Sequence, residues 1–319
     1  MKRLSAAALA VVPALAIVGA GSERAAEWRD ARRFPVVGRR VAVGSRTLDI
    51  YCEGSGSPTI IYESGKQIPG FFWKQILHRT AAFARSCWYD RAGMGWSDPA
   101  PAPRTARGIA TDLHSLLQAA GERPPYVVVA HSLGSFYARV FDGLYRDEVA
   151  GLVLVDPASE DIGTRMASTP RRKPPLSPAS MARVASTLGF FGVSRLFAGH
   201  PLPNPGSWSE ADWRELYALE QQPKSIAANA AEGPYQALGD EARAAGNFGS
   251  TPVLVLSAGH DALPLDALKE KLVIHRELAA KSVNGRAVVI EKSGHFIPLE
   301  FPDTVVWAVR SIVGQVARR

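Results

Sequence analysis

Short apolar runs alternate with amphipathic segments along most of this 319-residue chain. The apolar runs are typical of strands, and several are apolar on both faces, as buried parallel strands are. They stand at residues 40–43, 46–52, 59–62, 87–89, 127–129, 151–155, 253–256 and 287–290. The amphipathic periodicity predicts helices at residues 71–80, 105–120 and 302–316. Strands that alternate with helices predict an α/β fold, with a mostly parallel sheet covered on both faces.

One long segment, residues 159–250, interrupts this alternation. It is rich in Pro, Ala, Arg and Ser, and no strand pattern is clear in it. Helical periodicity occurs at residues 181–197 and 213–219. We therefore predict a helical lid inserted after the sixth strand. It would divide the core into a first part, residues 21–158, and a second part, residues 251–319.

Composition narrows the class of protein. Hydrophobic residues make up 46% of the chain, which is enough for a sizeable core and excludes wholesale disorder. The 37 basic and 30 acidic residues leave a net charge of +7. The basic residues are scattered and form no stripe with interleaved aromatic residues, so we do not expect a nucleic-acid partner.

The N-terminus has the pattern of a targeting segment. Lys2 and Arg3 precede an apolar stretch over residues 4–20, which ends in the small residues Val-Gly-Ala. This pattern predicts a cleaved signal peptide over residues 1–20 and an exported protein, periplasmic or secreted. The alternative is an uncleaved N-terminal anchor, through which residues 4–20 would hold the protein at a membrane.

The most informative motif follows the apolar run at residues 127–129. Ser132 lies in a short turn between this strand and a helical pattern, with the small residues Ala130 and Gly134 two positions away on each side. A serine in such a strand-turn-helix context is typical of a nucleophile elbow. The turn is tight, so bulky side chains at either flanking position would collide with neighbouring backbone.

The chain from about residue 40 to 316 resembles the α/β-hydrolase superfamily. Four segments carry the resemblance: residues 89–98, 130–134, 152–157 and 293–296. The resemblance implies an eight-stranded, mostly parallel sheet in the order 1-2-4-3-5-6-7-8, with strand 2 antiparallel. It also implies a Ser-His-acid triad. No metal-binding motif and no phosphate-binding loop is present in the sequence, so we expect no metal and no cofactor.

The resemblance assigns the triad residue by residue. Ser132 would be the nucleophile and His295, in a Gly-His turn after the last strand, the base. We prefer Asp261, just past the seventh strand, as the acid, with Asp156 at the end of the sixth strand as the alternative and Asp266 as a third option. His131 is expected to pack beside the elbow.

Further site residues follow from the same resemblance. The N–H groups of Leu133 and Lys66 are expected to form the oxyanion hole. The preceding Ser64-Gly65 departs from the usual His-Gly. Trp96, Leu188 and Phe191 are candidate pocket walls for the substrate.

The two cysteines suit an exported protein. Cys52 and Cys87 fall in strands that are neighbours in the superfamily, so the resemblance makes a cross-strand disulfide possible. The alternative is a pair of buried free thiols.

Taken together, these residues predict a serine hydrolase that cleaves a small carboxylic ester through an acyl-enzyme. Aspartate-dependent epoxide hydrolases and dehalogenases of this fold are excluded, because a serine occupies the elbow. Other α/β-hydrolase chemistry remains open: aminopeptidase or amidase, lactonase and cofactor-free perhydrolase. So does a non-catalytic member that binds a ligand in the same pocket.

Overall fold

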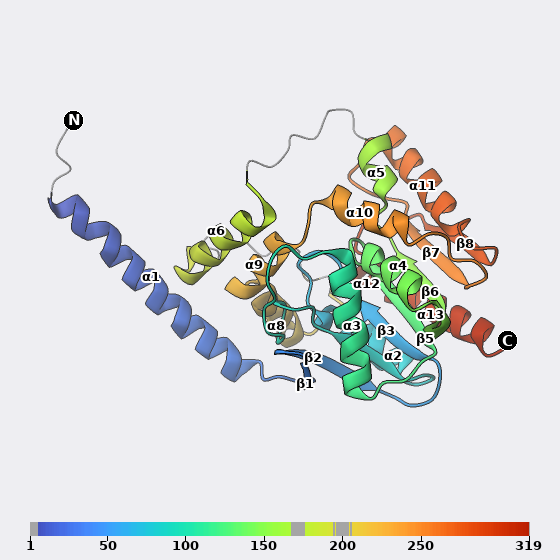
Figure 1. The fold of residues 1–319 in the computed structure, drawn as a ribbon, viewed down its shortest axis with the longest axis horizontal. Helices are drawn as coiled ribbons and strands as arrows, with labels where there is room; N and C mark the ends of the chain where they lie inside the picture. The colour runs from blue at the N-terminus through green and yellow to red at the C-terminus, as the bar shows by residue number, and fades with distance from the viewer. Residues whose placement is uncertain (1–5, 167–175, 194, 196–203, 205, 319) are drawn as a thin grey trace.

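One sheet of eight strands lies at the centre of the protein (Figure 1). The strands are β1 (Arg39–Val43), β2 (Arg46–Glu53), β3 (Thr59–Glu63), β4 (Ser86–Tyr89), β5 (Tyr126–His131), β6 (Val149–Val155), β7 (Val253–Ala258) and β8 (Gly285–Ile290). Their order in the sheet is β1-β2-β4-β3-β5-β6-β7-β8, which confirms the predicted order. β2 is antiparallel to β1 and β4, and the other pairs are parallel. The computed structural model describes residues 6–166, 176–193, 195, 204 and 206–318.

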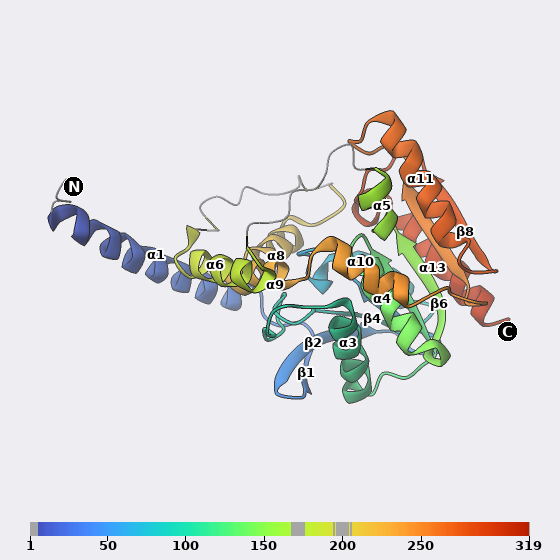
Figure 2. The same cartoon turned by 45° about the horizontal axis from the view of Figure 1, so that its top comes forward.

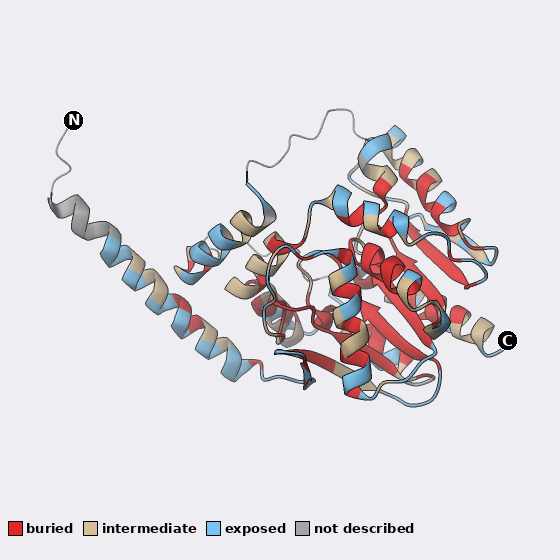
Figure 3. Cartoon of the chain, in the orientation of Figure 1, coloured by how far each residue is buried: buried red, intermediate tan, exposed pale blue. Residues whose placement is uncertain are grey.

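Helices cover both faces of the sheet (Figure 1). The inner strands β3 to β7 are almost entirely buried, whereas the edge strands β1 and β8 are partly exposed (Figure 3). The helices that connect or follow the strands are η1 (Gly70–Trp73), α2 (Lys74–Thr80), α3 (Ala106–Ala120), α4 (Gly134–Leu144), η2 (Arg146–Glu148), α11 (Leu265–Ala279), α12 (Ile297–Glu300) and α13 (Pro302–Val316). Successive strand residues point to opposite faces. Val128 therefore joins the core under α3 and α4, while Val127 and Val129 join the core under α2 and α13.

The two long helices predicted from periodicity are confirmed. α13 has the predicted bounds. α3 begins one residue later than predicted because Thr105 is its N-cap, and the Thr105 hydroxyl accepts a hydrogen bond from Gly108 N at 3.0 Å. The helix predicted at residues 71–80 is divided into the 3₁₀ helix η1 and the α-helix α2.

The segment between β6 and β7 consists of helices joined by turns and loops where the structure describes it. Its helices are α5 (Glu160–Arg165), α6 (Pro178–Phe190), α8 (Glu210–Glu220), α9 (Pro223–Ala231) and α10 (Tyr235–Ala244). The predicted helix at 213–219 lies within α8. The predicted helix at 181–197 is α6 for most of its length, and its last two residues lie outside the described residues.

The N-terminal helix, α1 (Ala6–Arg33), extends away from the sheet (Figures 1 and 2). It includes most of the stretch predicted to be a signal peptide, whose basic residues Lys2 and Arg3 lie outside the described residues. Its second half is tied to the segment after α6 by Arg195, which pairs with Glu23 and Asp30 at 2.8 Å each. Among the described residues, no helix is long and apolar enough to cross a membrane.

The antiparallel pair β2–β4 contains a disulfide. Cys52 and Cys87 are direct cross-strand partners, and their Cα atoms are 4.1 Å apart. The structure thus contains the disulfide rather than two free thiols.

Candidate active site

The turn between β5 and α4 holds Ser132 in a backbone conformation that non-glycine residues rarely adopt, with φ of 52°. Such local strain is typical of functional sites. Space around the turn is limited. A Cβ atom at Gly134 would lie 2.5 Å from the carbonyl oxygen of Ser64, so only glycine allows α4 to start this close to β3. Ala130 is fully buried at the end of β5 and is compatible with the turn.

Three side chains from distant parts of the chain meet at this turn. His295 Nε2 lies 2.9 Å from Ser132 Oγ, and His295 Nδ1 lies 2.6 Å from Asp156 Oδ2. A carboxylate only accepts, so Nδ1 donates to Asp156 and Nε2 is free to accept the serine proton. The geometry is that of a Ser-His-Asp triad.

The preferred acid of the sequence analysis, Asp261, is not the residue that contacts His295. Asp156 takes this position at the end of β6, where it also has a positive φ, of 39°. The Asp261 carboxylate instead accepts from Ala262 N and from Lys271 Nζ, each at 2.8 Å. The preference for Asp261 is therefore corrected, because both ring nitrogens of His295 already have their partners in Asp156 and Ser132.

A buried lysine joins the two aspartates. Lys271, on α11, is 4% exposed, and its Nζ lies 2.9 Å from Asp156 Oδ1 and 2.8 Å from Asp261 Oδ2. Burial opposes ionisation of Asp156, but the hydrogen bond from His295 and the charge of Lys271 outweigh it and hold the pKa of Asp156 well below its usual range. The carboxylate that orients His295 therefore stays charged at neutral pH.

Sequence reasoning missed Lys271 and its neighbour His275. His275 Nε2 donates to the carbonyl oxygen of Pro157 at 3.0 Å, and His275 Nδ1 accepts from the Ser257 hydroxyl at 2.8 Å. A signal was present, because both residues share a helical face with the buried Ile274. A lysine and a histidine on the apolar face of a helix indicate buried polar contacts.

His131 packs beside the elbow, as predicted. Its Nε2 donates to the carbonyl oxygen of His295 at 3.0 Å, and its ring stacks on Phe72 with centroids 5.6 Å apart. Burial lowers the pKa of His131 to about 3, so the ring is neutral near pH 7. His131 thus supports the loop that carries His295.

The loop after β3 is held by a second buried cation, Arg91, which lies in the segment 89–98 that carries the resemblance. Arg91 donates to the carbonyl oxygens of Ser64 and Gly65 at 2.7 Å each and pairs with Glu63 at 2.7 Å. These carbonyls belong to the peptide units just before Lys66. Among the described residues, the N–H groups of Leu133 and Lys66 donate to no protein acceptor. Both are therefore available to a ligand.

Comparison with known proteins identifies the family of the chain. The family model described as "Alpha/beta hydrolase family" matches residues 68–309. The chain belongs to this family. A thermophilic esterase from Thermogutta terrifontis has a similar fold, with a TM-score of 0.63 and 22% identity over 88% of this hydrolase and 98% of that chain. An enol-lactonase from Burkholderia xenovorans LB400 gives a TM-score of 0.62 and 18% identity over 86% and 100%. At these identities the likeness concerns the fold.

A curated relative is similar over a shorter stretch. The uncharacterized protein YqjL of Bacillus subtilis is 36% identical over 109 residues, which are 34% of this hydrolase and 43% of that protein. The hydrolase spans less than half the length of the curated relatives it matches.

A cavity of about 350 Å³ adjoins the triad of the hydrolase. Its walls come from the loop after β3, from η1, from α8 and its C-terminal end, and from the segment that follows His295. The lining residues are Lys66, Gln67, Ile68, Phe72, Trp213, Leu216, Tyr217, Glu220, Gln221, Phe296 and Leu299. Of these residues, only Lys66 was predicted to belong to the site, as an N–H donor of the oxyanion hole.

The predicted pocket walls lie elsewhere. Leu188 is 46% exposed on α6, and Phe191 caps the end of that helix. Trp96 lines a separate hollow together with Lys224. The assignment of these three residues to the pocket beside the triad is corrected. Leu188 and Phe191 lie on α6 and at its end, and α6 packs along α9 and α1. Trp96, in the loop after β4, lines the separate hollow instead.

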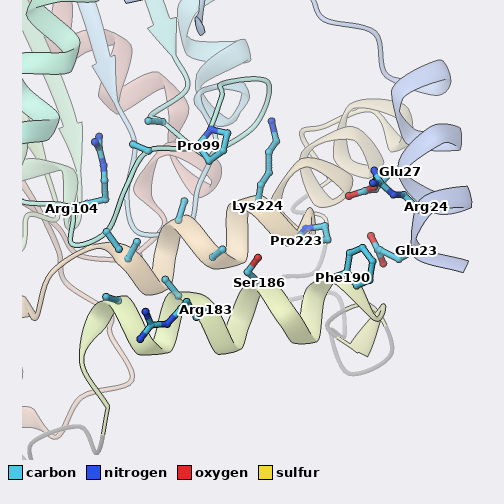
Figure 4. Close-up of a pocket in the computed structure, with 18 residues that line it drawn as sticks. Glu23, Arg24, Glu27, Pro99, Arg104, Arg183, Ser186, Phe190, Pro223 and Lys224 are labelled. Atoms are coloured by element: carbon cyan, nitrogen blue, oxygen red, sulfur yellow. The ribbon is translucent and has the colours of Figure 1, made fainter. Parts of the chain in front are cut away.

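The larger cavity of the hydrolase, about 550 Å³, lies between α1, α6 and α9 (Figure 4). Glu23, Arg183 and Phe190 are among its lining residues, and, unlike the cavity of about 350 Å³, it has no lining residue from the loop after β3 or from the segment that follows His295. Size alone therefore does not locate the chemistry of this molecule.

Proposed function

We propose that this hydrolase cleaves carboxylic esters through an acyl-enzyme formed on Ser132. One observation carries the proposal: a single imidazole, that of His295, is within hydrogen-bond distance of both Ser132 Oγ and Asp156 Oδ2. A hydroxyl is a weak nucleophile near neutral pH, and it reacts with a carbonyl when an oriented imidazole removes its proton.

In the proposed reaction, Ser132 Oγ attacks the ester carbonyl carbon while His295 Nε2 takes the hydroxyl proton. Asp156 stabilises the imidazolium that forms and does not itself accept the proton. The intermediate collapses as the ester C–O bond breaks, and His295 returns the proton to the departing alcohol. A water molecule, deprotonated by His295, then attacks the acyl-enzyme and releases the acid.

The negative oxygen of the tetrahedral intermediate would be bound by the N–H groups of Leu133 and Lys66. Leu133 immediately precedes α4, so the positive end of the helix dipole adds to its N–H. Arg91 holds the peptide units before Lys66 through the carbonyl oxygens of Ser64 and Gly65. Fixed donors of this kind stabilise the transition state because they need no reorganisation during the reaction.

The proposed substrate is a small ester, and the proposed location is an exported compartment. Two proteins of similar fold, an esterase and an enol-lactonase, favour acyl-oxygen chemistry. The disulfide Cys52–Cys87 supports an oxidising compartment, where such bonds persist. Export through residues 1–20 is part of the proposal.

The test uses a fluorophosphonate probe and a panel of 4-nitrophenyl esters of graded chain length. We expect the folded wild-type protein to be labelled and to hydrolyse at least one ester, and Ser132→Ala to lose both. The loss in kcat should be about 10⁶-fold, as for removal of a nucleophile from a serine triad. Ser135→Ala, a buried serine three residues away whose hydroxyl donates to the carbonyl oxygen of Ala158, is the matched control.

Two results would overturn the proposal. One is the absence of labelling in folded wild-type protein. The other is labelling that Ser132→Ala leaves undiminished, which would place the reactive group elsewhere.

A further inference from the structure

The cavity beside the triad contains an acidic residue without a protein partner. Glu220, the last residue of α8, lines the cavity and is partly buried. Among the described residues, no hydrogen bond or ion pair reaches its carboxylate. Burial raises the pKa of Glu220 to about 8. Burial therefore disfavours the ionised form of Glu220, and no partner among the described residues offsets this energetic cost.

The position of Glu220 on its helix adds to that cost. The C-terminal end of a helix carries a partial negative charge, so an acidic side chain there is repelled rather than stabilised. The carboxylate and the helix end together make this end of the cavity a place where a positive charge is favoured. Groups held in such unfavourable states are enriched at functional sites.

Nearby lysines do not neutralise Glu220. Lys66 lines the same cavity but forms no ion pair with it among the described residues, and burial alone accounts for the raised pKa of Glu220. Lys74 is engaged by Asp212 at 2.6 Å. With a pKa of about 8, the Glu220 carboxyl group is largely protonated near pH 7, and a cation that enters from outside would favour its ionised form.

The remaining walls of the cavity also suit an organic cation. Four aromatic residues line it: Phe72, Trp213, Tyr217 and Phe296. The faces of such rings attract ammonium groups, by about 0.5–1 kcal/mol at exposed sites and about 2 kcal/mol or more when water is excluded. Among the other polar lining groups, the amides of Gln67 and Gln221 are neutral, and Lys66 is basic.

The cavity is within reach of the proposed nucleophile. A Cβ atom placed on Gly65 would be 3.3 Å from Ser132 Cβ and 3.3 Å from Ile68 Cδ1, which lines the cavity. Phe296, another lining residue, directly follows His295. A substrate whose carbonyl lies at Ser132 could therefore place a second group among these walls.

We infer that this cavity binds an organic cation, so that the preferred substrates are esters bearing a protonated amine or a quaternary ammonium group paired with Glu220. That the substrates are esters rests on the proposed function. That the cavity binds a cation rests on the cavity alone. Ester chemistry takes place at Ser132, while Glu220 selects the substrate by charge.

The test compares esters that have the same shape and differ in charge. The probes are 4-nitrophenyl esters of ω-trimethylammonio acids of graded length, each matched with the neutral ester in which a tert-butyl group replaces trimethylammonio. The corresponding ω-amino acid esters distinguish a primary ammonium from a quaternary one. We expect kcat/KM to favour the best cationic ester by about tenfold over its neutral match. Glu220→Gln should reduce that ratio to near one.

Glu215→Gln is the matched control. Glu215 lies on the same helix and its pKa is also raised by burial, to about 7, but it does not line the cavity. It should keep the wild-type ratio. The inference is overturned if wild-type protein shows no preference for the cationic ester at any length, or if Glu220→Gln keeps the preference.

A binding measurement separates this inference from the proposed function. Calorimetric titration of benzyltrimethylammonium into wild-type protein, Ser132→Ala and Glu220→Gln needs no hydrolysis. We expect binding to the first two and at least about tenfold weaker binding to Glu220→Gln. If no ester is hydrolysed but this pattern holds, the function fails and the cation site stands. Equal affinity for all three proteins, or no binding to wild-type protein, would overturn the cation site.

Discussion

The carboxyl end of β6 and the loop after β7 each offer an aspartate to the same region, yet only one of them reaches His295. Asp156, at the end of β6, is 3% exposed and accepts from His295, Lys271 and the N–H of Ala258. Asp261, in the loop, lies nearer the surface and accepts from Lys271 and from its own neighbour, Ala262. A matching place in the chain order does not make a carboxylate the partner of the histidine.

The two regions differ in what holds them. The Asp156 carboxylate is fixed by donors from β7, α11 and the loop after β8, so its direction is set by three elements at once. The Asp261 carboxylate is fixed on one side by Lys271 alone. Lys271 is the element common to both, and it gives Asp261 a structural link to the proposed triad without contact with the imidazole. Asp156 thus orients the histidine directly, whereas Asp261 contacts Lys271, which supports Asp156.

The largest expected effect separates the two aspartates by activity. Asp156→Asn should lower kcat on the best ester by about 10⁴-fold, because the histidine loses the carboxylate that sets its tautomer and stabilises its charged form. Asp261→Asn should lower kcat by less than about tenfold, because it removes only an indirect contact. Steady-state rates on one 4-nitrophenyl ester measure both.

Asp266→Asn, at the exposed start of α11, is the control and should keep the wild-type rate. The comparison breaks if Asp261→Asn proves the more damaging change, since that would return the acid role to the loop after β7.

A smaller effect is expected from removal of the shared cation. Lys271→Met leaves the buried Asp156 carboxylate without its ion pair, and breaking a buried pair costs about 3–5 kcal/mol. Asp261→Asn removes only the more exposed contact of Lys271 and should cost about 1 kcal/mol or less. Urea denaturation at pH 7 gives the free energy of unfolding of each variant.

Lys269→Met serves as the control, because Lys269 is exposed on the same helix. If Lys271→Met and Asp261→Asn lower the free energy of unfolding equally, the ion pair of Lys271 with Asp156 is not its more stabilising contact.

The third effect is a dependence of stability on pH that comes from His275. Its Nδ1 lies 4.0 Å from Asp156 Oδ1, at the end of β6. Burial lowers the pKa of His275 to about 4, against about 6.5 in an unfolded chain. The unfolded state therefore binds more protons in this range, and stability must fall as pH falls from about 6.5 to about 4. The loss should approach about 3 kcal/mol from this residue.

His275→Gln should remove this part of the pH dependence while retaining a donor for Pro157. His131, whose pKa is also lowered by burial, contributes equally to both proteins and cancels in the difference. If the unfolding free energies of wild type and His275→Gln stay parallel between pH 7 and pH 4, the ring is not buried in its neutral form.

Much of the fold could be predicted from local pattern. β6 reads as an apolar run because both its faces are covered, and α13 reads as a helix because its apolar residues recur at helical spacing. The elbow was also predictable, since its demand for small residues at positions 130 and 134 is a local steric matter. Arg91 and Lys271 had no such motif, because a cation in a turn or helix usually faces water.

The cavity walls were the least predictable part of the candidate site. Leu188 and Phe191 have the helical spacing of a buried face, but Leu188 is 46% exposed on α6, which packs along α9 and α1. The residues that do line the cavity come from four separate segments, among them Phe72 and Glu220. Their proximity arises from how the segment after β6 packs on the sheet, which periodicity does not encode.

The amino-acid sequence determined the strained turn at Ser132 and the histidine turn at His295, because each depends on residues close together in the chain, and its resemblance to a family implied the order of the strands. Only the tertiary structure decided that Asp156 rather than Asp261 meets the imidazole, and that Glu220 faces the adjoining cavity. The reason is physical: a carboxylate acts over about 3 Å. Whether it lies that close to its partner depends on the packing of elements more than a hundred residues apart.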